Sequence, residues 1–293
     1  MTGGAWPMSD RQAKLTVRLA QIAPRLGDLA HNLDMHAQIV AAARADGIDL
    51  LVFPELSLTG YYLRDLVAEL GLYADCQQLR ALAEVAGQAR VVVGFVERDA
   101  QGRLFCSAGF VAGGVVRHVH RKLYLPTYGM FDEGRYLTPG DTVRAFDAGG
   151  FRAGLMVCED AWHLSVPLLL SRQGADMLIA VACSPARGLA VGRMAAQAAW
   201  EDMLATYARL TQSFVVFCNR VGWEDGVAFW GGSGLWGPSG EVLVRAPLLE
   251  EAVVDCRIDL RDLDAIRMAS PLLADERDEV TWREMERIFR GRA

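Results

Sequence analysis

The chain has 293 residues, of which 52% are hydrophobic and 23% are charged, and its formal net charge at pH 7 is −6. This length and apolar content allow a large buried core, and no linker or charge block divides the chain, so we expect a single domain over residues 1–293. The acidic balance and the lack of a basic run argue against nucleic-acid and anionic-membrane partners.

The six cysteines form no Cys-x-x-Cys pair, and several lie in apolar runs, which is typical of reduced thiols in the cytoplasm. The N-terminus lacks the basic and apolar regions of a signal peptide. No stretch reaches the roughly 18 apolar residues that a membrane-spanning helix requires. The sequence therefore predicts a cytoplasmic protein without a membrane span, with residues 1–13 disordered.

Strand and helix patterns alternate along the first half of the chain. The predicted strands cover residues 15–22, 48–53, 91–97, 104–112 and 114–125. The predicted helices cover residues 32–47, 63–70 and 76–88. Residues 126–150, rich in Gly, Pro, Tyr and acidic residues, are long for a connection, so we interpret them as a functional loop.

The second half repeats this alternation. The predicted strands cover residues 153–157, 175–182, 213–218, 231–237, 242–246 and 251–260. The predicted helices cover residues 164–173 and 191–210, and a charged amphipathic helix lies in a C-terminal tail over residues 271–293. Trp223, Glu224 and Asp225 either line a pocket mouth or turn the chain between strands. Because three strands in succession interrupt the alternation, a layered α/β sandwich fits better than a Rossmann or TIM-barrel arrangement.

Two predicted strands are followed directly by reactive side chains. Glu55 follows the strand that ends near residue 53, and Cys158 follows the strand over residues 153–157. Because open α/β sheets bind ligands at the carboxyl ends of their strands, we expect both side chains at one edge of the sheet. Lys122 ends another β-run just before the long loop. A carboxylate as general base, a thiol as nucleophile and an ammonium opposite an oxyanion suit attack on a carbonyl or nitrile carbon.

A cysteine–histidine pair is the alternative from the residues alone, because His163 lies five residues after Cys158. The His and Cys spacings offer too few ligands for zinc, and no Walker A sequence is present. Gly231, Gly232 and Gly234 lack the strand-to-helix context of a dinucleotide site. We therefore expect neither a metal nor a cofactor.

Four stretches in order resemble the nitrilase superfamily of carbon–nitrogen hydrolases: VFPELSLTGYYLRDL, HRKLYLPTYGMFDEGRYLTPG, GLMVCEDAW and NRVGWEDGVAFWGGSGLWGPSGEVL. The resemblance runs from about Leu15 to Asp259 and implies a four-layer αββα sandwich whose protomers commonly pair. It implies that Glu55 is the general base, Lys122 the stabiliser of the transition state and Cys158 the nucleophile. Glu133 matches a fourth catalytic member.

Within that superfamily, PTYGMFDEGRYL and CEDAW are most similar to the glutaminase domain of glutamine-dependent NAD synthetases. This likeness implies that Tyr128, Ser184 and Arg193 hold the substrate, with Arg187 as the alternative to Arg193. Glu159 would contact the substrate oxyanion through its backbone N–H. The chain has no SGGxDS-type loop of a synthetase domain, so ammonia would have to pass to a separate synthetase partner.

We therefore expect an amidase that releases ammonia from glutamine or a glutamine-like ω-amide through a cysteine thioester. The alternatives are an amidase or carbamoylase for another small amide, a nitrilase, and a non-catalytic binding subunit. Pairing of protomers into a dimer or larger homo-oligomer would give the C-terminal helix a role.

Overall fold

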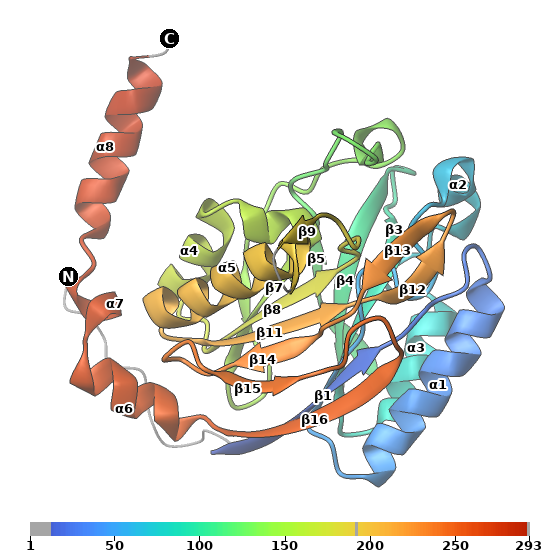
Figure 1. Ribbon diagram of the computed structural model, residues 1–293, viewed down its shortest axis with the longest axis horizontal. Helices are drawn as coiled ribbons and strands as arrows, with labels where there is room; N and C mark the ends of the chain where they lie inside the picture. The colour runs from blue at the N-terminus through green and yellow to red at the C-terminus, as the bar shows by residue number, and fades with distance from the viewer. Residues whose placement is uncertain (1–12, 191–192, 292–293) are drawn as a thin grey trace.

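Two six-stranded sheets form the centre of the computed structural model, which describes residues 13–190 and 193–291 (Figure 1). In spatial order the first sheet contains β16 (Ala252–Asp259), β1 (Lys14–Gln21), β2 (Leu50–Val52), β3 (Arg90–Arg98), β4 (Leu104–Ala112) and β5 (Val115–Arg121). The second contains β15 (Val242–Arg245), β14 (Gly234–Trp236), β11 (Phe214–Asn219), β8 (Met177–Ala182), β7 (Arg152–Val157) and β6 (Ala145–Asp147). The disorder expected over residues 1–13 lies outside the described residues, apart from Ala13.

Each sheet has a parallel centre. In the first sheet β1, β2 and β3 run parallel, and in the second β7, β8 and β11 do. β5 also runs in the direction of β3, because β4 lies antiparallel to both. The carboxyl ends of these strands therefore gather at one edge of each sheet, which is where such sheets bind ligands.

Helices cover the outer faces of both sheets, which gives four layers (Figure 1). The first sheet packs against α1 (Leu29–Ala45) and α3 (Gln77–Ala86), and the second against α4 (Ser165–Arg172) and α5 (Ala195–Thr211). The helix predicted over residues 63–70 begins as the 3-10 turn η1 (Arg64–Leu66) and continues as α2 (Val67–Leu70). The predicted αββα sandwich is confirmed.

Alternation along the strands explains how the layers pack. In β3, Val91, Val93 and Phe95 belong to the core that contacts α1 and α3. Val92 and Val96 belong to the core shared with the second sheet. The near-continuous apolar runs of the sequence therefore form strands that are buried on both faces.

The long helix predicted over residues 191–210 begins later than expected. α5 starts at Ala195, because β10 (Arg193–Met194) first pairs antiparallel with β9 (Leu189–Ala190). Residues 191 and 192 lie outside the described residues. The prediction of the helix start was wrong because a short hairpin precedes the helix.

A second hairpin follows β11 and was not among the predicted elements. It contains β12 (Val221–Glu224) and β13 (Val227–Trp230), and Asp225 and Gly226 form its turn with positive φ angles. An Asp-Gly pair favours this turn, because glycine adopts positive φ without strain. Of the two interpretations of residues 223–225, the structure shows the turn between strands.

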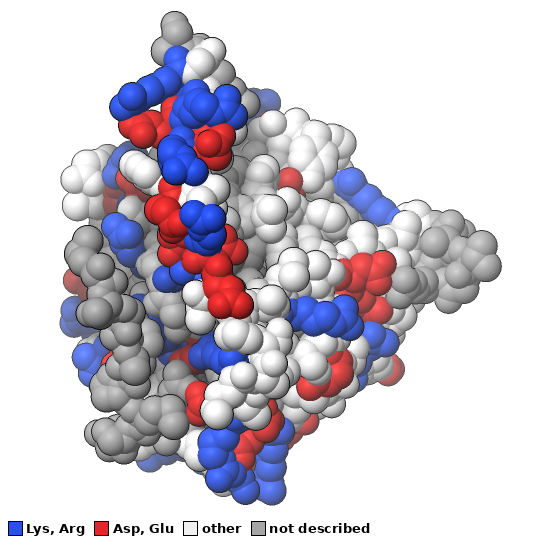
Figure 2. Space-filling model, turned by 90° about the vertical axis from the view of Figure 1, so that its left-hand side faces the viewer, with Lys and Arg blue, Asp and Glu red and all other residues white. Residues whose placement is uncertain are grey.

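The chain ends in an arm of three helices: α6 (Arg261–Ala269), α7 (Leu272–Asp275) and α8 (Asp278–Arg290). α8 is the charged amphipathic helix expected in the tail over residues 271–293, whereas the short α7 was not among the predicted elements. α8 stands away from the sandwich (Figure 1). Acidic and basic side chains are interspersed along the arm (Figure 2), while Trp282 and Phe289 are exposed. No helix in the described part of the chain is both long and apolar enough to cross a membrane.

Candidate active site

The ends of four strands bring the predicted catalytic side chains together. Glu55 follows β2, Lys122 is the residue after β5, Cys158 is the residue after β7, and Cys183 is the residue after β8. Glu133 joins them from the 3-10 turn η2 (Glu133–Arg135), within the long segment predicted as a functional loop. We call Glu55, Lys122, Glu133 and Cys158 the inner cluster.

Close packing of two backbones positions Glu55. Gly94 of β3 lies against the chain on either side of Glu55, and an added Cβ there would lie 2.4 Å from both the Pro54 oxygen and the Leu56 nitrogen. Only glycine permits this approach. Pro54 ends β2, because proline cannot donate to the sheet ladder.

Lys122 joins the two carboxylates of the inner cluster. Its Nζ donates to Glu55 Oε1 at 2.8 Å and to Glu133 Oε1 at 2.7 Å, and its side chain is fully buried. Burial alone would lower the pKa of Lys122, but the charges of Glu133 and Glu55 raise it well above its ordinary value. The side chain therefore carries a fixed positive charge inside the protein.

The buried carboxylate of Glu133 has a raised proton affinity. Burial raises its pKa to about 7, although the Lys122 ammonium opposes this shift, and the nearby charge of Glu55 adds to it. Its Oε1 also accepts the Tyr61 hydroxyl at 2.5 Å. Its Oε2 is buried and has no hydrogen-bond partner among the described residues. Tyr61 was not predicted as a site residue, although it lies in the quoted stretch after Glu55.

The remaining contacts of Glu55 come from cysteines. Its Oε2 accepts the backbone N–H of Cys183 at 2.7 Å, and the Cys106 thiol lies 3.5 Å from its Oε1. Cys183 Sγ in turn donates to the backbone oxygen of Glu55 at 3.1 Å. The carboxylate is thus held from both sheets, and sequence spacing gave no signal for these contacts.

The Cys158 thiol is buried beside these charges. Burial raises the pKa of the thiol well above its ordinary value and so does the charge of Glu55, whereas the Lys122 ammonium and the nearby backbone N–H of Cys183 lower it. Cys158 has φ of 45°. This left-handed conformation costs a residue other than glycine roughly 1–3 kcal/mol. The thiol is held in a strained turn and needs a base to lose its proton.

A buried ion pair fixes the segment between Glu55 and η1. Glu224 of β12 accepts the backbone N–H groups of Tyr61 and Tyr62, at 2.8 and 2.7 Å, through its Oε1. Its Oε2 pairs with Arg220, which lies over the ring of Phe229. The hairpin β12–β13 therefore sets the position of the tyrosine that contacts Glu133.

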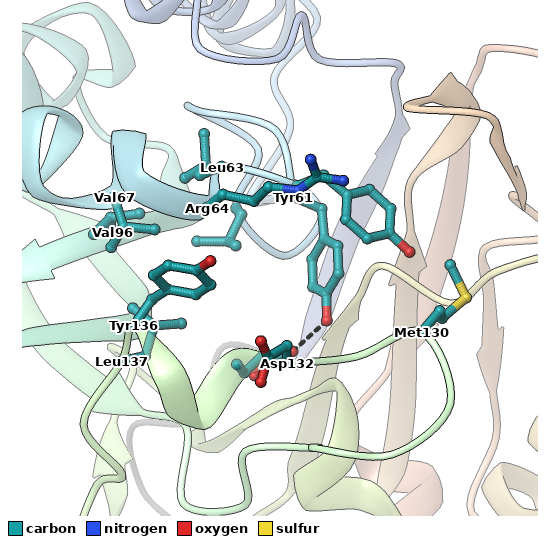
Figure 3. A pocket seen from close by; sticks show the side chains of 12 residues that line it. Tyr61, Leu63, Arg64, Val67, Val96, Met130, Asp132, Tyr136 and Leu137 are labelled. Carbon is teal, nitrogen blue, oxygen red and sulfur yellow. Dashed lines mark hydrogen bonds between the residues drawn. The ribbon is translucent and has the colours of Figure 1, made fainter.

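A cavity of about 250 Å³ adjoins the inner cluster (Figure 3). Tyr61 and Glu133 contribute polar atoms to its lining, and most other lining side chains are apolar, among them Leu63, Val67 and Val96. Figure 3 shows the Tyr61 hydroxyl directed toward the carboxylate to which it donates. Cys158 is not among the residues that line this cavity.

Tyr128, Glu159 and Arg187 are more exposed, and we call them the rim. The Tyr128 hydroxyl donates to Glu159, at 3.0 Å from Oε1 and 2.9 Å from Oε2. Burial and this hydrogen bond raise the pKa of Tyr128 to about 12. The Arg187 guanidinium lies 4.9 Å from the ring centroid of Phe131. Two of the predicted substrate-binding residues thus contact each other.

Of the other two predicted substrate-binding residues, the structure describes the side chain of Ser184 but not that of Arg193. Ser184 is buried, and its Oγ accepts the indole N–H groups of Trp200 and Trp230 at 2.9 and 3.0 Å. A serine hydroxyl that accepts two hydrogen bonds can still donate its own hydrogen. The backbone of Arg193 belongs to β10, but its side chain lies outside the described residues.

His163, the alternative partner for Cys158, has other contacts. Its ring is stacked on Tyr124 with 3.4 Å between centroids, and its Nε2 is 4.0 Å from Glu159 Oε1. These contacts associate it with the rim. Within the residues that the structure describes, no group of three or more His, Cys, Asp or Glu side chains could hold a metal ion.

Residues 16–268 match the carbon-nitrogen hydrolase family, so the chain belongs to that family. It is similar to the glutamine-dependent NAD(+) synthetase of Thermotoga maritima, with 32% identity over 265 residues that make up 88% of this chain and 44% of that protein. The chain thus spans less than half the length of the curated relatives it matches.

Two solved structures are also similar to this chain in fold. The glutamine-dependent NAD+ synthetase of Acinetobacter baumannii, in complex with ADP, matches with a TM-score of 0.75 and 27% identity over 84% of this chain and 46% of that one. An amidase of the nitrilase superfamily from Nesterenkonia has the same fold, with a TM-score of 0.77 and 22% identity over 94% of this chain and 99% of that one. The predicted nitrilase-superfamily membership is confirmed, and the chain is a carbon–nitrogen hydrolase.

Proposed function

We propose that this chain is an amidase that hydrolyses the side-chain amide of glutamine or a glutamine-like ω-amide and releases ammonia. The observation that carries the proposal is the inner cluster: a buried thiol lies beside a carboxylate and an ammonium, and the ammonium is 2.8 Å from that carboxylate. These are the groups that acyl transfer from an amide requires. The names of the similar synthetases support glutamine as the amide donor.

In the first half of the proposed reaction Cys158 Sγ attacks the amide carbon. Glu55 takes the thiol proton, which is needed because burial raises the pKa of the thiol. Lys122 and the backbone N–H of Glu159 hold the oxyanion, and loss of one such donor typically costs roughly 3 kcal/mol. Glu55 then gives its proton to the departing nitrogen, so ammonia leaves and a thioester remains.

Water completes the cycle. Glu55 accepts a proton from water as the oxygen attacks the thioester carbon, the carbon–sulfur bond breaks, and the proton passes to the thiolate. Glu133 stays hydrogen-bonded to Lys122 and keeps the ammonium beside the reacting carbon. In this proposal the rim and Ser184 bind the rest of the substrate.

Ammonia release from glutamine, measured for matched variants, tests the proposal. Cys158→Ala and Glu55→Gln should each abolish release, because one removes the nucleophile and the other its base. Cys256→Ala, a half-buried cysteine of β16, is the matched control and should retain activity. Undiminished release by Cys158→Ala, or a covalent adduct on another cysteine by mass spectrometry, would refute the mechanism.

Other primary amides, carbamoyl amines and nitriles assayed in parallel would identify the substrate class. A preference for one of them over glutamine would favour the corresponding alternative. A wild-type protein that binds glutamine without turnover would favour a non-catalytic binding subunit.

We also propose that the ammonia passes to a synthetase partner, because the curated relatives that the chain matches are named glutamine-dependent NAD(+) synthetases. Glutamine turnover should rise when an ammonia-dependent NAD synthetase is added. Turnover that does not respond would count against such a partner.

We further propose that the chain forms a homo-oligomer. α8 has 13 residues, and Trp282, Met285 and Phe289 are exposed along it. An isolated helix shorter than about 12–15 residues is marginal in water, so packing against a second copy would stabilise it. Light scattering should show that the wild type is a dimer or a larger assembly. Trp282→Glu should dissociate this assembly, whereas Arg283→Glu, the control, should leave it intact. A monomeric wild type would refute this.

A further inference from the structure

The buried carboxylate of Asp160 connects the two segments that carry Lys122 and Cys158. Asp160 belongs to the 3-10 turn η3 (Cys158–Trp162) and is fully buried. Its Oδ1 accepts the backbone N–H groups of Leu123 and Tyr124, at 2.9 and 3.2 Å. Because Leu123 and Tyr124 directly follow Lys122, the carboxylate fixes the backbone on the C-terminal side of Lys122.

The other carboxylate oxygen of Asp160 contacts both the segment that carries Cys158 and the strand that leads to Lys122. Oδ2 accepts the backbone N–H of Val157 at 3.0 Å, and Val157 directly precedes Cys158. It also lies 2.8 Å from Nε2 of His120, which is on β5 two residues before Lys122. A carboxylate can only accept, so Nε2 carries the hydrogen of this bond.

We propose that Asp160 and His120 are positioning residues that set the Cys158 thiol against the Lys122 ammonium. This inference rests on the proposed function. Neither side chain takes or gives a proton in the reaction; each acts through the backbone that it holds. With His120 the carboxylate spans the first and second sheets, so a change in the contact between the sheets would move the nucleophile relative to the cation.

The geometry favours positioning over simple filling of space. A buried carboxylate is costly unless its oxygens are hydrogen-bonded, and here four donors satisfy the two oxygens. One of the donors is adjacent to Cys158, whose left-handed backbone is strained. Strain of this kind persists only where surrounding contacts hold it.

Asp160→Asn tests the carboxylate with almost no change of shape. An amide offers one oxygen and one NH₂ group, so the NH₂ must face either the N–H groups of Leu123 and Tyr124 or that of Val157. One connection is lost in either orientation. We expect kcat for ammonia release to fall about 100-fold with KM changed less than about threefold, because a displacement of roughly 1 Å can cost that much rate.

Variants of His120 test the same connection from β5. His120→Leu removes the donor to Asp160 and should lower kcat about tenfold, whereas His120→Gln keeps an N–H donor and should restore most of it. The matched control is His118→Leu on the same face of β5. The His118 ring is stacked on Phe146, and its Nε2 has no hydrogen-bond partner within the described residues, so kcat should stay unchanged.

Thermal unfolding of each variant shows whether a loss of activity is merely a loss of folded protein. If Asp160→Asn does not fold, the comparison of His120→Leu with His120→Gln tests the inference instead. An active wild type with Asp160→Asn equally active would overturn the inference alone. Equal kcat values for His120→Leu and His120→Gln would do the same. An inactive wild type would overturn the proposed function and this inference with it.

Discussion

The inner cluster and the rim hold their side chains in different ways. Lys122 is fully buried and hydrogen-bonded to two carboxylates at 2.7 and 2.8 Å, and it follows a strand end. Tyr128 is 55% exposed, lies in a loop, and contacts Glu159, another rim residue. The comparison separates a rigid centre suited to chemistry from a surface that can change partners when a substrate binds.

The largest effect should come from Lys122→Met, which removes the cation between two buried carboxylates. We expect ammonia release to fall about 10³-fold and the free energy of unfolding to fall by about 3–5 kcal/mol at pH 8. The loss of stability should be smaller at pH 5, because the pKa of Glu133 is about 7 and its carboxylate takes up a proton there. Urea unfolding at both pH values measures this.

Lys14→Met is the matched control, because Lys14 is exposed at the start of β1 and is the only other lysine of the chain. It should change neither quantity. A Lys122→Met protein as stable as the wild type at pH 8 would mean that the inner cluster is not the rigid centre described above.

The side chains of the inner cluster could be predicted because their signals are local. Glu55 and Cys158 each follow a buried apolar strand, and a strand end is recognisable from a few neighbouring residues. The parallel strands then place both at one edge. The superfamily resemblance, read from four stretches in order, supplied the four-layer fold and the choice of Glu133.

Contacts between distant segments could not be predicted in the same way. Tyr61 donates to a carboxylate 72 residues further along the chain, and Cys183 donates to Glu55 from 128 residues away. Such pairs depend on how the two sheets stack, which periodicity does not encode. The start of α5 was missed for a related reason, since the β9–β10 pairing competes with helix formation.

The next largest effect is the contribution of Glu133 to the pH dependence of stability. Its pKa is raised from 4.5 to about 7, so the folded state binds this proton more tightly than the unfolded state does. The resulting stabilisation is complete below pH 4.5 and is lost as the pH rises through about 7. Glu133→Gln cannot titrate and should lack this dependence.

The free energy of unfolding of the wild type minus that of Glu133→Gln should therefore fall between pH 4.5 and 7, by on the order of 3 kcal/mol. Chemical unfolding at several pH values gives the difference directly. A difference that is flat, or that rises with pH, would show that Glu133 is not buried as described.

A smaller effect separates two adjacent tyrosines. The Tyr61 hydroxyl donates to Glu133, whereas the buried Tyr62 hydroxyl has no hydrogen-bond partner within the described residues. Tyr61→Phe should lower the free energy of unfolding by about 1.5–3 kcal/mol, since a bond to a charged group is lost. Tyr62→Phe should change it by less than about 0.5 kcal/mol. Equal losses would show that the Glu133 contact contributes nothing specific.

The smallest effect should come from the rim. Within the described part of the chain the Tyr128 hydroxyl donates to another rim side chain, so Tyr128→Phe should raise KM for glutamine about 3- to 10-fold with kcat close to the wild-type value. Tyr73→Phe, at a tyrosine that is 50% exposed, should change neither constant. If Tyr128→Phe instead lowers kcat more than about tenfold at constant KM, the hydroxyl acts on the reacting atoms. Tyr128 would then belong with the inner cluster, and the boundary between a rigid centre and an adaptable rim would have to be drawn outside it.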